Sequence, residues 1–216
     1  PEYAAFFRDQ ADIAEAGGWS RQQMSAAFSR FRILMDETVK GASPFIATVL
    51  VDQTTEEKIA YLEARMAENS AERRADAQAE TAADAADERV ERRVDGFSRF
   101  MGDLTEAQIA IVRRYTDDGM DNSLRWLDHR EKRQSALVTF LRTEPTREDL
   151  SRFVHQILVR SHELVDPDYQ AISESRWALL ENMYFDVLST LSDEQRDTLV
   201  FTLRDYADDM LSLAGA

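Results

Sequence analysis

The sequence predicts an all-α fold, an elongated antiparallel bundle of eight to ten helices, and three observations support this prediction. Apolar residues recur at the three- and four-residue spacing of amphipathic helices along nearly the whole chain. Helix-start signals of the form hydroxyl-x-x-Glu/Gln stand before these apolar runs. The 216 residues include only 7 glycines and 4 prolines, too few for the tight turns of a β-sandwich or barrel.

The N-terminal quarter holds the first three expected helices. Residues 2–16 form a helix that a pair of glycines ends. A second helix starts at the Ser20–Gln23 capping box and is expected to end at Gly41. Residues 44–52 are the one strand-like apolar run, and because no second strand could pair with it, we expect a short buried helix there.

Further start signals divide the rest of the chain. They stand at Thr54–Glu57, Thr105–Gln108, Thr146–Asp149 and Ser192–Gln195. Each precedes an amphipathic run, and two more helices are expected over 122–142 and 168–191.

Residues 67–89 differ from the rest because they are rich in alanine and charged residues and carry no large apolar side chain. A stripe of small residues recurs there at every fourth position: Ala67, Ala71, Ala75 and Ala79. One continuous helix over 55–101 would be about 70 Å long. Three alternatives stay open: two helices broken near Thr81, a solvated helix that projects from the body, and a partner-docking arm whose alanine stripe permits close helix approach.

We expect one all-helical domain over 1–216. A possible division separates the N-terminal helices (1–66), the charged helix (67–101) and a C-terminal bundle (102–216).

Composition excludes several classes of protein. The 41 acidic and 26 basic residues give a net charge of −15, which argues against a nucleic-acid partner because such proteins present a basic face. The absence of cysteine excludes disulfides and thiolate metal sites. No apolar run approaches the length of a membrane span.

The sequence offers no catalytic, cofactor-binding or metal-binding residues. Among the three histidines, His155 and His162 are expected on one helix about 10 Å apart, too far for one metal ion, and His129 stands alone. No His-Glu-x-x-His, phosphate-binding glycine loop or Gly-x-Ser-x-Gly is present. We therefore expect no cofactor and no enzyme, and an enzyme with carboxylates between helices remains a minor alternative.

Trp126 and Arg130 are neighbours on one face of an expected helix and could stack. Both residue types are frequent in binding hot spots, so the pair could contact a partner, or it could simply cover the rim of the core.

The order of these segments resembles an uncharacterised family of Gram-negative bacterial lipoproteins, an all-helical domain of unknown function. The segments that carry the resemblance are Pro1–Ala4, Leu62–Asn69, Arg92–Phe100, Leu104–Gln108, Trp126–Gln134, Leu191–Arg196 and Leu203–Asp209. The resemblance implies a periplasmic location and a lipid anchor at the N-terminus of the precursor, and it supplies no catalytic residues.

Two of these segments, Leu104–Gln108 and Leu191–Gln195, also resemble the Leu-Thr-x-x-Gln repeat of Spy-type periplasmic chaperones. The prediction from the sequence is a non-enzymatic envelope module that binds an unknown protein partner. A holdase-type chaperone is the alternative.

Overall fold

The computed structural model describes residues 1–79, 82–117 and 122–215, and every regular element in these residues is a helix. In chain order the ten helices are α1 (Glu2–Glu15), α2 (Arg21–Val51), α3 (Glu56–Ala79), α4 (Ala82–Met101), α5 (Glu106–Asp117), α6 (Asn122–Leu141), α7 (Arg147–Val159), α8 (Ser161–Leu164), α9 (Tyr169–Leu188) and α10 (Asp193–Gly215). The predicted all-α class and number of helices are confirmed.

Contacts group the chain into two compact units, each assembled from segments distant in the sequence. Unit 1 comprises Pro1–Leu34, Ala83–Gly119 and Arg176–Ala216. Unit 2 comprises Met35–Ala82 and Met120–Ser175. These units do not follow the possible division at 66/67 and 101/102, and a single domain over 1–216 stays a prediction.

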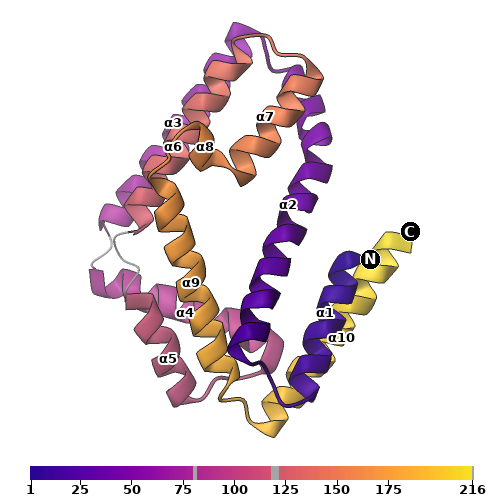
Figure 1. The fold of residues 1–216 in the computed structure, drawn as a ribbon. Coiled ribbons are helices and arrows are strands. Elements are labelled where there is room, and N and C mark those ends of the chain that lie inside the picture. The colour runs from indigo at the N-terminus through magenta and orange to yellow at the C-terminus, as the bar shows by residue number, and fades with distance from the viewer. Residues whose placement is uncertain (80–81, 118–121, 216) are drawn as a thin grey trace. The chain divides into compact units, whose positions relative to one another are not determined.

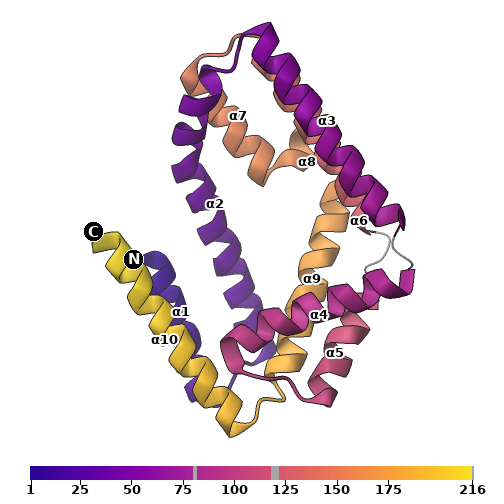
Figure 2. The same ribbon diagram turned by 180° about the vertical axis from the view of Figure 1, so that it is seen from behind.

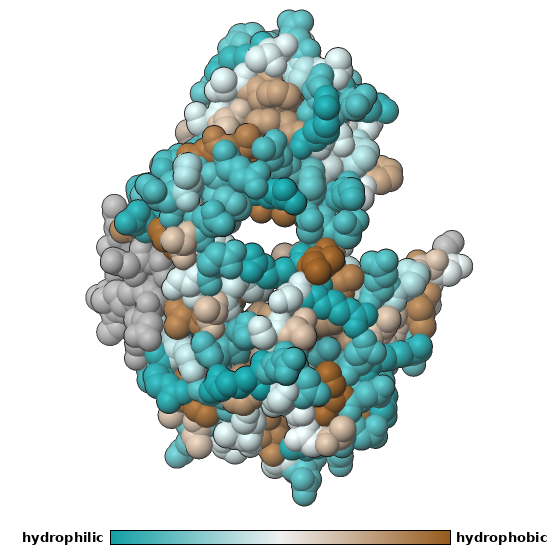
Figure 3. All heavy atoms as spheres, in the orientation of Figure 1, coloured by the Kyte–Doolittle hydropathy of each residue, from teal (hydrophilic) through white to brown (hydrophobic). Residues whose placement is uncertain are grey.

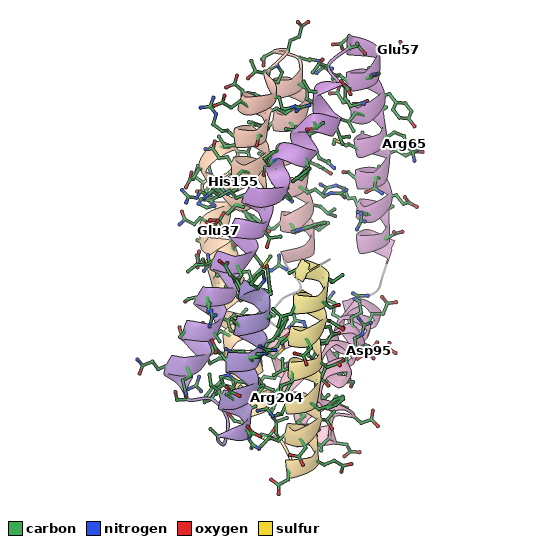
Figure 4. All side chains as sticks on the ribbon, turned by 90° about the vertical axis from the view of Figure 1, so that its right-hand side faces the viewer. Glu37, Glu57, Arg65, Asp95, His155 and Arg204 are labelled. Atoms are coloured by element: carbon green, nitrogen blue, oxygen red, sulfur yellow. The ribbon has the colours of Figure 1, made fainter. Side chains whose placement is uncertain are left out.

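In unit 1, α1 and α10 lie side by side along their length (Figures 1 and 2). Alanines at the contact, Ala11, Ala14 and Ala207, have no exposed surface, so small side chains let the two helices approach closely. Arg204 of α10 reaches back to α1 (Figure 4), where its guanidinium lies 2.7 Å from a Glu15 carboxylate oxygen. This ion pair is exposed, so it contributes little beyond orientation.

The main core of unit 1 combines side chains from α1, α4, α5, α9 and α10. Its buried members are Ala11, Ala14, Val90, Phe97, Met101, Val112, Met183, Val187, Leu199, Val200 and Leu203. A smaller cluster of Phe6, Ala27 and Leu34 joins α1 to the start of α2.

Two of the predicted capping boxes meet in the interior of unit 1. Gln108 and Gln195 each accept the backbone N–H of their own N-cap residue, Thr105 at 2.9 Å and Ser192 at 3.2 Å. Their amides also bind each other, from Gln108 Nε2 to Gln195 Oε1 at 2.9 Å and from Gln195 Nε2 to Gln108 Oε1 at 3.0 Å. Gln195 Nε2 also donates to the Asp103 carbonyl at 2.8 Å. The pair therefore fixes the α4–α5 connection to the α9–α10 connection.

The other boxes are local. Ser20 and Gln23 form a solvent-exposed box, with Ser20 N–H donating to Gln23 Oε1 at 2.9 Å. Thr146 accepts the N–H of Asp149 at 3.2 Å. Thr54 differs from the prediction, because its hydroxyl donates to the Val51 carbonyl at 3.1 Å at the end of α2.

The prediction that a helix ends at Gly41 and a separate buried helix covers 44–52 is wrong. A single helix, α2, runs through Pro44 to Val51. Ser43 and Ala47 are 1% and 0% exposed on the inner face, so continuing the helix keeps that face packed despite the N–H that proline lacks. The segment is only half buried, since Phe45 and Val49 are 76% and 66% exposed.

Of the predicted span 55–101, the structure describes α3 up to Ala79 and α4 from Ala82. The expected break near Thr81 lies outside the described residues. In unit 2, α3 pairs with α6 (Figures 1 and 2) through polar contacts: Ser70 donates to Gln134 Oε1 at 3.1 Å, and Arg74 lies 2.8 Å from Asp128.

The apolar core of unit 2 joins α2, α3, α6 and α7. Its buried members are Ala47, Ile59, Val138, Leu141, Leu150 and Val154. On the other side of α3, Glu57 and Arg65 point away from the unit (Figure 4).

Hydrophilic residues cover most of the face seen in Figure 3, as the net charge of −15 leads one to expect. None of the described helices is both long enough and apolar enough to cross a membrane.

The contact between the Gln108 and Gln195 amides should contribute measurably to stability. Gln195→Ala should lower the free energy of unfolding by about 3 kcal/mol, because it removes a cap and leaves the buried Gln108 amide without its partner. Gln23→Ala, the same change in the exposed box, should cost about 1 kcal/mol or less. Urea unfolding measures both.

The double variant Gln108→Ala/Gln195→Ala should lose at least 1 kcal/mol less than the sum of the two single losses. Additive losses would show that the two amides do not act as a unit.

Candidate functional site

Unit 1 contains an apolar cavity of about 460 Å³, within the usual size range of small-molecule pockets. Side chains from α1, α2, α4, α9 and α10 and the connection after α1 form its wall. They are Phe6, Phe7, Gln10, Trp19, Met24, Ala27, Phe28, Phe31, Gly96, Phe97, Phe100, Met101, Trp177, Leu180, Tyr184, Leu188, Leu199 and Leu203. Phe6, Met24, Phe97, Leu199 and Leu203 are buried, whereas Gly96 and Tyr184 are exposed, so the cavity reaches the interior and opens to solvent on one side.

Aromatic rings packed edge to face define one wall. Phe28 lies 6.2 Å from the Trp177 centroid and 5.6 Å from Tyr184, at interplanar angles of 82° and 74°. Tyr184 also meets Phe97 at 4.7 Å. Because rigid rings meet at their edges, they cannot close over the remaining space as flexible aliphatic chains would.

Few polar groups face this cavity. The Trp19 indole N–H donates to Gln10 Oε1 at 2.9 Å, which satisfies both. The Tyr184 hydroxyl is the second polar group, and burial among the rings raises its pKa while the positive charge of Arg93 lowers it. The cavity is therefore suited to an apolar ligand that makes at most one polar contact with the wall.

The turn after α1 places Trp19 in the wall. Gly17 and Gly18 have φ values of +117° and +101°, which favour glycine, and they reverse the chain so that Trp19 faces α1. The sequence predicts only a helix end at Gly17-Gly18. Trp19 was not predicted as a site residue, because a lone tryptophan after a turn carries no periodic signal.

Gly96 of α4 lies at the exposed rim of the cavity. A Cβ atom added there would meet no atom within 4 Å. The rim thus has room for a larger side chain at this position.

The predicted partner residues Trp126 and Arg130 belong to unit 2, apart from this cavity. The Arg130 guanidinium lies 5.7 Å from the Trp126 centroid, so the expected stacking is present. Arg130 also donates to Asn69 Oδ1 of α3 at 2.9 Å. The pair joins α6 to α3, and a contact with a partner stays a prediction.

The alanine stripe lies on the exposed flank of α3, where Ala67, Ala71 and Ala75 face solvent. The side chain of Ala79 lies outside the described ones. Partner docking along this flank also stays a prediction.

Unit 2 buries His129, which is 2% exposed and stacks on Tyr169 at 3.7 Å with an interplanar angle of 3°. Its Nε2 lies 2.8 Å from Ser161 Oγ, and its Nδ1 lies 3.7 Å from Asp166 Oδ2. Burial, with the charge of Arg133, lowers the pKa of His129 although Asp166 opposes this. Lys132 binds the Asp166 carboxylate at 2.7 Å and lowers its pKa.

Ser161, His129 and Asp166 are the residue types of a serine–histidine–aspartate triad, but their distances do not fit one. The distance of 3.7 Å is too long for a hydrogen bond, and Nδ1 has no partner among the described atoms. Ser161 is only 9% exposed and does not line the apolar cavity of unit 1. The arrangement is a buried polar network that links α6 to α8.

The prediction that His155 and His162 share one helix is wrong, because α7 ends at Val159 and α8 begins at Ser161. His155 (labelled in Figure 4) binds Asp36 of α2 at 2.8 Å. The part of the chain that the structure describes holds no group of three or more ligand-type residues suited to a metal ion.

The fold and the cavity together define an all-α protein with an aromatic-lined apolar cavity. The chain belongs to the family of unknown function DUF6279, whose sequence profile matches residues 1–170. The chain matches no curated protein and no solved structure. Membership confirms the predicted resemblance to an uncharacterised family, whereas the lipoprotein features and the likeness to Spy-type chaperones stay predictions.

Because His129 is buried, the stability of the protein should depend on pH. Its pKa is lower in the folded protein than in the unfolded chain, so the unfolded chain binds a proton that the fold does not bind. The stability contribution is present above the unfolded pKa of about 6.5 and is lost progressively as the pH falls from there through the lower folded-state pKa.

Urea unfolding across this pH range measures the effect. His129→Gln and His129→Phe should both make the free energy of unfolding depend less on pH than it does in the parent. The two variants differ in that only phenylalanine retains an aromatic ring against Tyr169. An unchanged slope in both variants would show that His129 is not the source.

Proposed function

We propose that the protein is a non-catalytic binding protein that takes an elongated apolar ligand into the cavity of unit 1. The observation that carries this proposal is the cavity of about 460 Å³ with its largely aromatic lining. Transfer of apolar surface from water contributes roughly 0.8 kcal/mol for each buried CH₂ group. An apolar space of this size therefore favours an apolar occupant over water, which needs polar partners that the wall does not offer.

This proposal differs from the role predicted from the sequence, which is binding of a protein partner; it shares with that role only the absence of catalysis. A periplasmic location and a lipid anchor rest on the resemblance alone and are proposed on that ground. A protein partner at Trp126, Arg130 or the alanine stripe is a further proposal, independent of the cavity.

The chaperone alternative requires a broad exposed apolar surface for unfolded clients. The lining residues Phe6, Met24 and Phe97 are 8% or less exposed, and Tyr184 is 41% exposed, so the cavity has a buried part that a small ligand could fill more readily than a polypeptide. The two Leu-Thr/Ser-x-x-Gln segments have a structural role as the paired caps, so they add no argument for chaperone activity.

The first experiment uses the tryptophans as reporters. Trp19 and Trp177 line the cavity, whereas Trp126 lies in unit 2. A long brominated alkane quenches tryptophan fluorescence on contact, so it should quench the Trp126→Phe variant as it does the parent. The double variant Trp19→Phe/Trp177→Phe should show no saturable quenching.

A matched pair of glycine variants provides the control. Gly96→Leu fills the rim and should weaken binding of the alkane about tenfold, because leucine displaces about two CH₂ groups of ligand. Gly41→Leu makes the same change on α2 in unit 2, where an added Cβ also meets no atom within 4 Å, and should leave affinity unchanged. Both variants should fold, since leucine favours a helix more than glycine by about 0.7 kcal/mol.

Equal affinity of the two glycine variants, or quenching that persists without Trp19 and Trp177, would contradict the cavity as the binding site.

A hydrolase is the second candidate, favoured only by the 2.8 Å contact between His129 and Ser161. Ser161 is 9% exposed, and we expect no covalent labelling by a fluorophosphonate probe. Stoichiometric labelling that Ser161→Ala abolishes would support a catalytic role and contradict a purely binding function.

A further inference from the structure

Two arginines of α4 lie on the helix face that continues into the cavity wall of unit 1. Arg89, Arg93, Phe97 and Met101 follow one another at four-residue spacing, and Phe97 and Met101 line the cavity. On α9, Arg176 is exposed and does not line the cavity, but it lies close enough to Arg93 for its positive charge to act on that group.

Arg93 connects the two helices. Its Nη1 atom lies 3.5 Å from the Met183 sulfur of α9, a weak acceptor, and not against a carboxylate. Burial, together with the positive charges of Arg176 and Arg89, lowers the pKa of Arg93, and the nearby Tyr184 raises it. Within the described residues no carboxylate acts on this group.

Arg89 is also incompletely satisfied. Its Nε and Nη2 atoms are buried and have no hydrogen-bond partner among the described atoms. A buried guanidinium without a counter-charge is costly, and like charges nearby increase the cost. An anion placed between these arginines would remove both costs.

We propose that unit 1 binds a single-chain anionic amphiphile, with its apolar chain in the aromatic cavity and its acidic headgroup at Arg89, Arg93 and Arg176. This inference rests on the proposed function and adds the class of ligand. Guanidinium forks match the paired oxygens of a carboxylate or phosphate. The net charge of −15 disfavours a polyanion such as nucleic acid, whereas one headgroup feels chiefly the local cluster of arginines.

Three ligands with the same chain and different headgroups test the proposal: palmitate, hexadecanol and hexadecyltrimethylammonium. Each displaces the neutral apolar probe Nile red from the intact protein, below its critical micelle concentration. We expect palmitate to bind at least tenfold more tightly than hexadecanol, and the cation to bind most weakly.

Arg93→Gln should weaken palmitate binding about tenfold and leave hexadecanol binding unchanged. Arg89→Gln should act in the same direction and serves as the second variant. Arg92→Gln is the matched control on the same helix, because Arg92 is exposed and already paired with Glu88 at 3.0 Å, and it should leave both ligands unaffected.

The Tm measured without ligand distinguishes a ligand-binding role of Arg93 from a structural role. Removing one of three clustered cations should leave the Tm of Arg93→Gln equal to or above that of the parent, whereas a structural arginine would lower it.

The outcomes are distinguishable. Equal affinities for palmitate and hexadecanol, with no effect of Arg93→Gln or Arg89→Gln, would overturn the headgroup site and leave the apolar site intact. Absence of any displacement and of Nile red binding would instead contradict the proposed function itself.

Discussion

The reciprocal amide contact between Gln108 and Gln195 is the interaction on which unit 1 depends. Each glutamine closes the first turn of its own helix and at the same time satisfies its counterpart in the interior. The contact joins the start of α5 to the start of α10, and Gln195 also binds the Asp103 carbonyl in the connection that follows α4. The helices α4, α9 and α10 supply much of the cavity wall. A buried polar pair of this kind has few alternative partners, so it specifies one arrangement of the helix ends.

The cavity follows from the kind of side chain that fills this frame. Tyr184 contacts Phe28 edge to face and Phe97 at a tilted angle of 44°, and the rigid outlines of these rings leave space that leucines would have filled. An unfilled apolar space loses dispersion contacts and costs stability. An occupant that restores those contacts would stabilise unit 1, which is the physical link between the packing of this unit and a binding role.

Both units hold arginine nitrogens that are buried without a hydrogen-bond partner among the described atoms: Nε and Nη2 of Arg89 in unit 1, and Nη1 of Arg130 and Nε of Arg133 in unit 2. In each unit burial and a neighbouring arginine lower the pKa of one guanidinium, Arg93 in unit 1 and Arg133 in unit 2. What distinguishes Arg89 and Arg93 is their place, on the face of α4 that continues into the cavity wall through Phe97 and Met101.

The sequence by itself determined the all-α class, most helix starts and the family, because apolar periodicity and capping boxes are local signals. It failed at Pro44, where packing of Ser43 and Ala47 maintained the helix, and at His155 and His162, which separate helices carry. Only the tertiary structure decided that Gln108 meets Gln195 and that Trp19 and Trp177 face one cavity. Those contacts join residues that are remote along the chain, and no local pattern encodes which side chains meet.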